Sequence, residues 1–362
     1  LINLSVPEVV EEGKLSTEVT EEEIEEGVMD EYGVIYSKDG LRLLKGNSEL
    51  TTYTVRKGTR VICDEAFKYC NLESITLPQG VKNIGDDAFH HCDALKSITL
   101  PQGVKNIGDD AFHHCDALKN ITLPQGVKSI GNYAFSFCKA LTSITLPQGV
   151  KSIGNHAFSS CDNLTSITLP QGVKSIGNYA FYNCEALTSI TLPQGVENIG
   201  HNPFAYCNNL SSIICCSPYF KVIDKMLLTS DGKRLISYWG KENIVNVPQK
   251  VESIGDGAFY ICGTLTSITL PQGVKSIGDG AFHGCYALTS ITLPQGVKNI
   301  GDDAFSSCEA LTSITLPQGV ESIENSAFYY CYALTSIRIP QGTKAHFQWI
   351  LPSDLHEIIR EY

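Results

Sequence analysis

The chain contains 362 residues, of which 43% are hydrophobic and 18% charged, so it can bury a sizeable core and is not disordered throughout. Its net charge of -12 is concentrated before Tyr32, where eleven acidic residues accompany a single lysine. The near-neutral remainder lacks the basic stripe that nucleic acids or anionic membranes require, and no apolar run approaches the ~18 residues that cross a bilayer.

The chain begins with an acidic segment, residues 1–31, for which the sequence allows a short helix or a disordered lead. Thr20 followed by Glu23 resembles a capping box, and both alternatives remain open. Because the first residue is Leu1 rather than Met, the absence of a signal segment says little about localisation.

A tandem repeat follows, over residues 32–342. Its step is 23 residues, with one step of 22, and its phenylalanine recurs at Phe67, Phe89, Phe112, Phe135, Phe158, Phe181 and Phe204, and again at Phe259, Phe282, Phe305 and Phe328. One repeat, Leu141–Asn163, reads LTSITLPQGVKSIGNHAFSSCDN. Its first six residues alternate as a half-buried strand does, LPQG is typical of a type I turn, and Val150 with Ile153 forms a second, shorter apolar pair.

A single repeat cannot fold alone. Its buried side chains contribute about 10–20 kcal/mol, whereas ordering 23 residues costs about 35 kcal/mol. Stacked neighbours must supply the difference, so the repeats predict a solenoid. Thirteen strand segments can be counted, which gives a parallel sheet about 60 Å long with short second strands beside it.

Each repeat ends in a corner with the pattern AFxxC. In the example, we expect Phe158 and Cys161 to share the inward face of a short helical turn that Asn155 caps. Asp or Asn occupies this cap position in ten of eleven repeats, and His201 is the exception. Capping accounts for either residue type, whereas a calcium site, the alternative, needs several converging carboxylates.

Two segments interrupt the pattern with hairpin signals, at about residues 32–45 around Asp39 and at about 219–240 around Asp231. We expect the first to cap the array and the second to project from its middle as an island. Residues 343–362 break the repeat and concentrate apolar residues, which predicts a C-terminal cap over the last rung. The expected parts are therefore residues 1–31, a single solenoid over 32–342, and the cap.

Cysteine and histidine are the side chains most open to a chemical role. Eleven of the fourteen cysteines fill one repeat position, where we favour buried, reduced thiols over disulfides between coils, and a bridge within the pair Cys215 and Cys216 is a further alternative. The pairs His90-His91 and His113-His114 should lie together on the surface, where an adventitious metal site competes with simple surface variation. We expect no resident metal, cofactor or catalytic group, because a stacked array filled by Phe and Leu offers no unique pocket.

Two sets of residues are candidates for binding. Outward strand positions form a nearly uncharged hydroxyl surface, and in three adjacent repeats they are Thr142, Ser143, Thr145, Thr165, Ser166, Thr168, Thr188, Ser189 and Thr191. This surface can be a binding floor, a solvated spacer face or, least in keeping with a curved array, an ice-ordering lattice. The second set is the aromatic group of the island, Tyr219, Phe220, Tyr238 and Trp239, because recognition surfaces favour Tyr and Trp.

The unit LxxIxLPxxVxxIGxxAFxxCxx, as in Leu141–Asn163, resembles the BspA-like class of leucine-rich repeats, as do the hairpin strings around Asp39 and Asp231. The resemblance covers Tyr32 to about Gly342. It implies a leucine-rich-repeat solenoid that is secreted or displayed at the cell surface and that adheres to host matrix or to other cells. It supplies no catalytic residues and no fixed binding motif, and the asparagine ladder of plant and animal leucine-rich repeats is missing.

From the residues and the resemblance together, we expect a non-enzymatic interaction protein whose partner is an extracellular protein or glycoconjugate. The alternative is a structural or spacer solenoid whose binding segments lie outside this chain. The two expectations differ in whether the chain itself captures a ligand.

Overall fold

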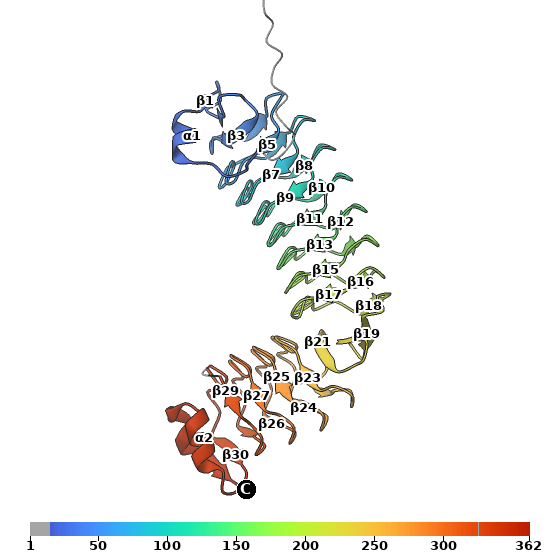
Figure 1. Cartoon of the computed structure of the whole chain (residues 1–362), viewed down its shortest axis with the longest axis vertical. Coiled ribbons are helices and arrows are strands. Elements are labelled where there is room, and N and C mark those ends of the chain that lie inside the picture. The colour runs from blue at the N-terminus through green and yellow to red at the C-terminus, as the bar shows by residue number, and fades with distance from the viewer. Residues whose placement is uncertain (1–14, 325) are drawn as a thin grey trace, which may run out of the picture.

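The computed structural model describes residues 15–324 and 326–362, and in them the repeats stack as a β-solenoid (Figure 1). Thirteen strands lie at the first strand position of the repeat, as the sequence predicts. They are β4 (Thr52–Thr54), β6 (Ser74–Thr76), β8 (Ser97–Thr99), β10 (Asn120–Thr122), β12 (Ser143–Thr145), β14 (Ser166–Thr168), β16 (Ser189–Leu192), β18 (Ser212–Cys215), β22 (Ile244–Asn246), β24 (Ser267–Thr269), β26 (Ser290–Thr292), β28 (Ser313–Thr315) and β30 (Ser336–Ile339).

The second strand position carries two-residue strands. They are β5 (Val61–Ile62), β7 (Asn83–Ile84), β9 (Asn106–Ile107), β11 (Ser129–Ile130), β13 (Ser152–Ile153), β15 (Ser175–Ile176), β17 (Asn198–Ile199), β23 (Ser253–Ile254), β25 (Ser276–Ile277), β27 (Asn299–Ile300) and β29 (Ser322–Ile323). These short strands form the longest ladders, in sheets of ten and seven strands, whereas the first strands pair in separate runs of two to four. The expected single sheet of about thirteen strands is therefore divided.

The N-terminal segment packs onto the first coils. Helix α1 (Glu21–Glu25) has the capping box between Thr20 and Glu23, so the described part of the acidic segment contains the short helix, one of the two alternatives that the sequence left open. Strands β1 (Val28–Met29), β2 (Ile35–Tyr36) and β3 (Arg42–Lys45) extend the ten-stranded sheet beyond β5. The part of the acidic segment before residue 15 lies outside the described residues.

At the other end, α2 (Lys344–Ile350) buries Phe347, a 3-10 turn spans Ser353–Ile358, and β31 (Ile359–Glu361) pairs with β30 in parallel. β31 therefore covers the open edge of the last first-position strand. None of the described helices is long and apolar enough to cross a membrane.

The AFxxC corners are not helical turns, which corrects the sequence prediction. The ten corners from Glu65 to Ser307 each place two residues in the left-handed region, as at Tyr133 (φ 53°) and Phe137 (φ 58°). The backbone N–H groups of Tyr133, Phe135 and Phe137 each donate to a carbonyl of the next coil at 2.8 Å. The alternating conformation turns these groups along the solenoid axis, so bonding between coils replaces bonding within a helix.

The Asp/Asn position is a ladder between coils rather than a helix cap. Asn155 Oδ1 accepts the N–H of Asn178 at 2.8 Å, and Asn178 Oδ1 accepts that of His201 at the same distance. Either residue type supplies the acceptor oxygen. The exception, His201, stands at the end of the ladder, where the next corner is missing and no further N–H follows.

The core consists of stacked phenylalanines. Ring centroids of successive coils lie 5.1–5.7 Å apart with nearly parallel planes, in one stack from Phe67 to Phe204 and another from Phe259 to Phe328. The buried apolar residues accordingly form two large clusters. We refer to them as the first and second arrays.

The segment around Asp231 separates the two arrays instead of projecting as an island. Its strands are β19 (Phe220–Ile223), β20 (Met226–Thr229) and β21 (Arg234–Tyr238). Leu227 belongs to the first core and Leu228 to the second, so the β20–β21 hairpin is a partition with one apolar face toward each array. This placement is favourable because the facing ends of the two arrays would otherwise expose the phenylalanines Phe204 and Phe259 to solvent.

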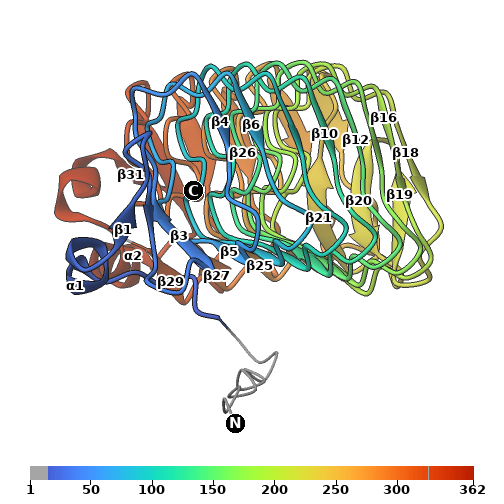
Figure 2. The same cartoon turned by 90° about the horizontal axis from the view of Figure 1, so that it is seen from above.

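The solenoid bends at this partition, with β16, β18 and β19 toward the outer side of the bend (Figures 1 and 2). One corner is missing there, so the corners on either side of the gap meet directly on the inner side. Asn202 donates its side-chain amide to Gly257 O, and His201 Nδ1 lies 2.8 Å from Asp256 Oδ2. Loss of one corner shortens the corner side of the stack, which accounts for the direction of the bend.

Candidate interaction surfaces

The hydroxyl surface is exposed as the sequence predicts. All nine candidate side chains of β12, β14 and β16 and their preceding residues are exposed, while the intervening isoleucines are buried. The strands are in register, with Ser143 opposite Ser166 and Thr145 opposite Thr168. The surface runs along the outer side of the bend (Figure 1), a position that repeat periodicity does not specify.

The aromatic residues of the partition divide into exposed and buried members. Tyr219 is 50% exposed and Phe220 is half-buried. Tyr238 and Trp239 are only 3% and 6% exposed, because Trp239 packs edge-on against Phe204 at 6.4 Å and Tyr238 lies 5.2 Å from Phe259. The expectation that all four form one exposed contact group is therefore wrong for Tyr238 and Trp239, which close the ends of the two phenylalanine stacks.

The histidine pairs form two stacked columns on the corners. His90 lies 4.8 Å from His113 and His91 lies 4.3 Å from His114 between ring centroids. Burial, followed by the nearby imidazole of His90, lowers the pKa of His113 to about 4. No group of three or more His, Cys, Asp or Glu with metal-binding geometry occurs in the described residues, so these columns carry no proposal of a metal site.

The cysteines are free thiols, in agreement with the favoured interpretation. The repeat cysteines fill the core, and their Sγ–H groups donate to the carbonyl of the preceding coil's phenylalanine, as from Cys161 to Phe135 O at 3.1 Å. Burial raises the pKa of the Cys161 thiol well above its usual value, which opposes the nucleophilic thiolate form. Cys215 and Cys216 are unbridged, and Cys216 is exposed.

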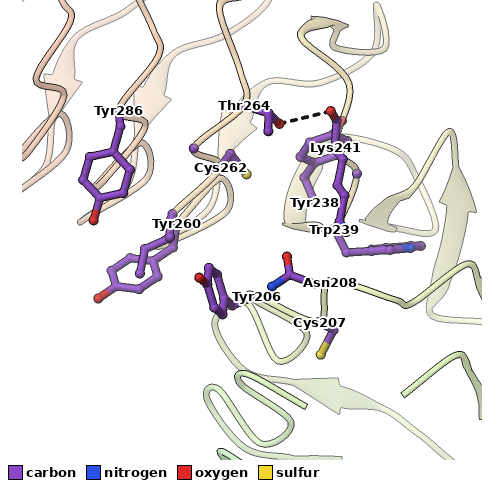
Figure 3. Close-up of a pocket in the computed structure, with 13 residues that line it drawn as sticks. Tyr206, Cys207, Asn208, Tyr238, Trp239, Lys241, Tyr260, Cys262, Thr264 and Tyr286 are labelled. Carbon is purple, nitrogen blue, oxygen red and sulfur yellow. Dashed lines mark hydrogen bonds between the residues drawn. The ribbon is translucent and has the colours of Figure 1, made fainter. Parts of the chain in front are cut away.

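A cavity of about 350 Å³ lies where the two arrays meet, and we call it the junction cavity (Figure 3). The sequence predicts no such cavity. Tyr206, Tyr260 and Tyr286 lie along one side, with Tyr238 and Trp239 on the other. Two signals in the sequence marked its place: the missing corner, and Gly263 at a repeat position that most other coils fill with a longer side chain.

The fold and these surfaces define a leucine-rich-repeat solenoid. The family model described as "BspA type Leucine rich repeat region" matches residues 45–140, 128–230 and 237–348. The chain therefore belongs to the BspA-type leucine-rich-repeat family. No curated protein matches it.

Solved structures agree with this assignment. A leucine rich cell surface protein from Faecalibacterium prausnitzii is 30% identical, with a TM-score of 0.69 over 90% of this chain and 97% of that one. The pneumococcal vaccine antigen PcpA is 22% identical, with a TM-score of 0.61 over 86% and 84% of the two chains. A leucine-rich repeat protein from Eubacterium ventriosum, also 22% identical, has a TM-score of 0.59 over 85% and 76%. The last two similarities concern the fold alone.

Proposed function

We propose that this chain is a secreted or cell-surface protein that binds an extracellular protein or glycoconjugate by rigid display and takes part in adhesion without catalysing a reaction. The observation that carries the proposal is the exposed, uncharged hydroxyl surface, which repeats in register from coil to coil. Its similarity to a protein described as a cell surface protein supports the location. Family membership supports a binding role, because leucine-rich-repeat arrays generally present extended surfaces to partners.

Rigidity supports display as the mode of action. Within each array, backbone bonds join successive coils at the second strand position and at the corners, and they join runs of two to four coils at the first strand position. The Asp/Asn ladder adds side-chain bonds between coils of both arrays. A surface held in this way loses little conformational entropy when a partner binds. The alternative, a spacer solenoid, has the same rigidity but captures no ligand.

A charge-patterning experiment separates the two. In one variant, alternating charges replace hydroxyls of three adjacent coils through Thr145→Lys, Thr168→Glu and Thr191→Lys. The control places the same charges on the neighbouring exposed turns through Gln148→Lys, Gln171→Glu and Gln194→Lys. Neighbouring charges are opposite in both variants, so repulsion between coils is matched.

Purified protein is then tested for binding to immobilised matrix proteins, mucins and whole cells. We expect the wild type and the glutamine control to bind at least one of these, and the threonine variant to bind at least about tenfold more weakly. Equal binding by both variants would reject the hydroxyl surface as the contact. A folded wild type that binds none of them would favour the spacer function.

A further inference from the structure

The junction cavity exists because one corner is missing. On one edge of the gap, Asn202 and Gly257 close the corners onto each other through a hydrogen bond. On the other edge, Tyr206 of the first array and Gly263 of the second both border an open recess. We propose that this recess binds a saccharide that carries a carboxylate group. The inference deepens the proposed function and rests on it only for the biological setting.

The walls of the cavity are aromatic and reachable from solvent. Tyr206 is 40% exposed and Tyr286 is 44% exposed, whereas Tyr260 is half-buried and stacks on His283 at 5.0 Å. Tyrosine presents an apolar ring and a polar hydroxyl together. A pyranose has the complementary character, because its C–H groups form apolar faces and its hydroxyls surround the rim.

Glycine keeps the recess open. A Cβ added at Gly263 would lie 3.3 Å from the ring of Tyr286, closer than an ordinary van der Waals contact. Next to it, Ile261 adopts a left-handed φ of 55°, which is costly for a β-branched residue, and its side chain leans against Gly284 of the following coil. The same position is left-handed in the other corners, so what distinguishes this one is the β-branched side chain and not the φ value.

Unpaired polar groups at the cavity indicate the ligand's chemistry. Lys241 is exposed and Asn208 is half-buried, and neither the ammonium nor the side-chain amide has a hydrogen-bond or ion-pair partner in the described part of the chain. Thr264 donates its hydroxyl to Lys241 O at 3.0 Å and keeps its oxygen as an acceptor. None of the lining residues, all of them described, is acidic. Glu242 accepts the hydroxyl of the lining residue Tyr238, but its carboxylate is ion-paired with Lys225 at 2.7 Å. One unpaired cation with no lining carboxylate favours an anionic ligand.

These features favour a saccharide over an aromatic peptide side chain. A purely apolar occupant would cover the half-buried amide of Asn208 without giving it a hydrogen bond, which costs free energy. The volume of about 350 Å³ lies at the small end of ligand sites and suits about one or two sugar rings.

The test uses the full chain with Trp349→Phe, which leaves Trp239 in the cavity wall as the only indole. Fluorescence and calorimetric titrations compare trisaccharides ending in glucuronic or sialic acid with their neutral counterparts and with tyrosine-rich peptides. We expect the acidic sugars to bind and to change the Trp239 emission. In this chain, Tyr286→Ala should weaken binding about tenfold, and Lys241→Gln should remove the preference for acidic over neutral sugars.

The matched control is Tyr332→Ala, which removes a 75% exposed tyrosine from the same repeat position of the last coil, outside the cavity, and should leave affinity unchanged. Binding that is undiminished in Tyr286→Ala, tighter binding of the peptides, or no binding of acidic sugars by the folded chain would overturn the proposal. Sugar binding and adhesion to cells are measured separately, so either can fail while the other succeeds.

Discussion

Replacing Trp239 with alanine is expected to uncouple the two arrays. The indole is 6% exposed and covers the end of the first phenylalanine stack with an edge contact to Phe204 at 6.4 Å. Truncating a buried tryptophan costs about 3–5 kcal/mol. Nε1 of Trp239 has no acceptor among the described residues, and the substitution also removes this unsatisfied N–H, which offsets part of the cost. We therefore expect the free energy of unfolding to fall by about 3 kcal/mol.

The consequence follows from the linear architecture. The stability of a solenoid is the sum of its units and of the interfaces between neighbours, so weakening the single interface at the partition lets each array unfold separately. Urea unfolding followed by circular dichroism should change from one transition to two, and calorimetry should show two heat-absorption peaks.

Two control variants isolate the cause. Trp239→Phe keeps a ring in place and removes the unpaired N–H, so it should stay close to the wild type. Trp349→Ala removes an indole that is 87% exposed and should change the free energy of unfolding by less than about 0.5 kcal/mol. A single transition at the wild-type midpoint in Trp239→Ala would refute the partition as the coupling element.

Three further predictions concern the corners and the core. Asn155→Ala should lower the free energy of unfolding by about 1 kcal/mol in urea titrations because the N–H of Asn178 loses its acceptor, whereas Asn155→Asp should be nearly neutral. Folding lowers the pKa of His113 from 6.5 to about 4, so the unfolded chain binds the proton more tightly and stability should fall as the pH drops from 6.5 toward 4. His113→Asn should reduce this loss when melting temperatures at pH 7 and pH 5 are compared. Iodoacetamide should modify exposed Cys216 before buried Cys161, and mass spectrometry that found the reverse order would contradict the described core.

Much of the fold could be predicted from the sequence because it depends on local periodicity. The alternation in LTSITL places Ile144 in the core and Thr145 outside, and the 23-residue step aligns these positions in every coil. Each coil repeats the same local pattern, so stacking and the exposed hydroxyl surface follow directly. The capping box at Thr20 is likewise a contact between near neighbours in sequence.

Other features depend on contacts between coils, which the local pattern does not contain. The interchange of Asp and Asn is compatible both with a helix cap and with a ladder, and the φ values of Tyr133 and Phe137 decide for the ladder. Tryptophan is a residue type common at recognition surfaces, yet Trp239 is buried because it covers an open end of the core.

The sequence by itself determined the solenoid, its register and the residues of its two faces, because every repeat has apolar residues at the same inward positions and polar residues at the same outward positions. Only the tertiary structure decided the bend, the partition and the junction cavity. These arise where one corner is absent, so that Asn202 meets Gly257, which lies 55 residues further along the chain.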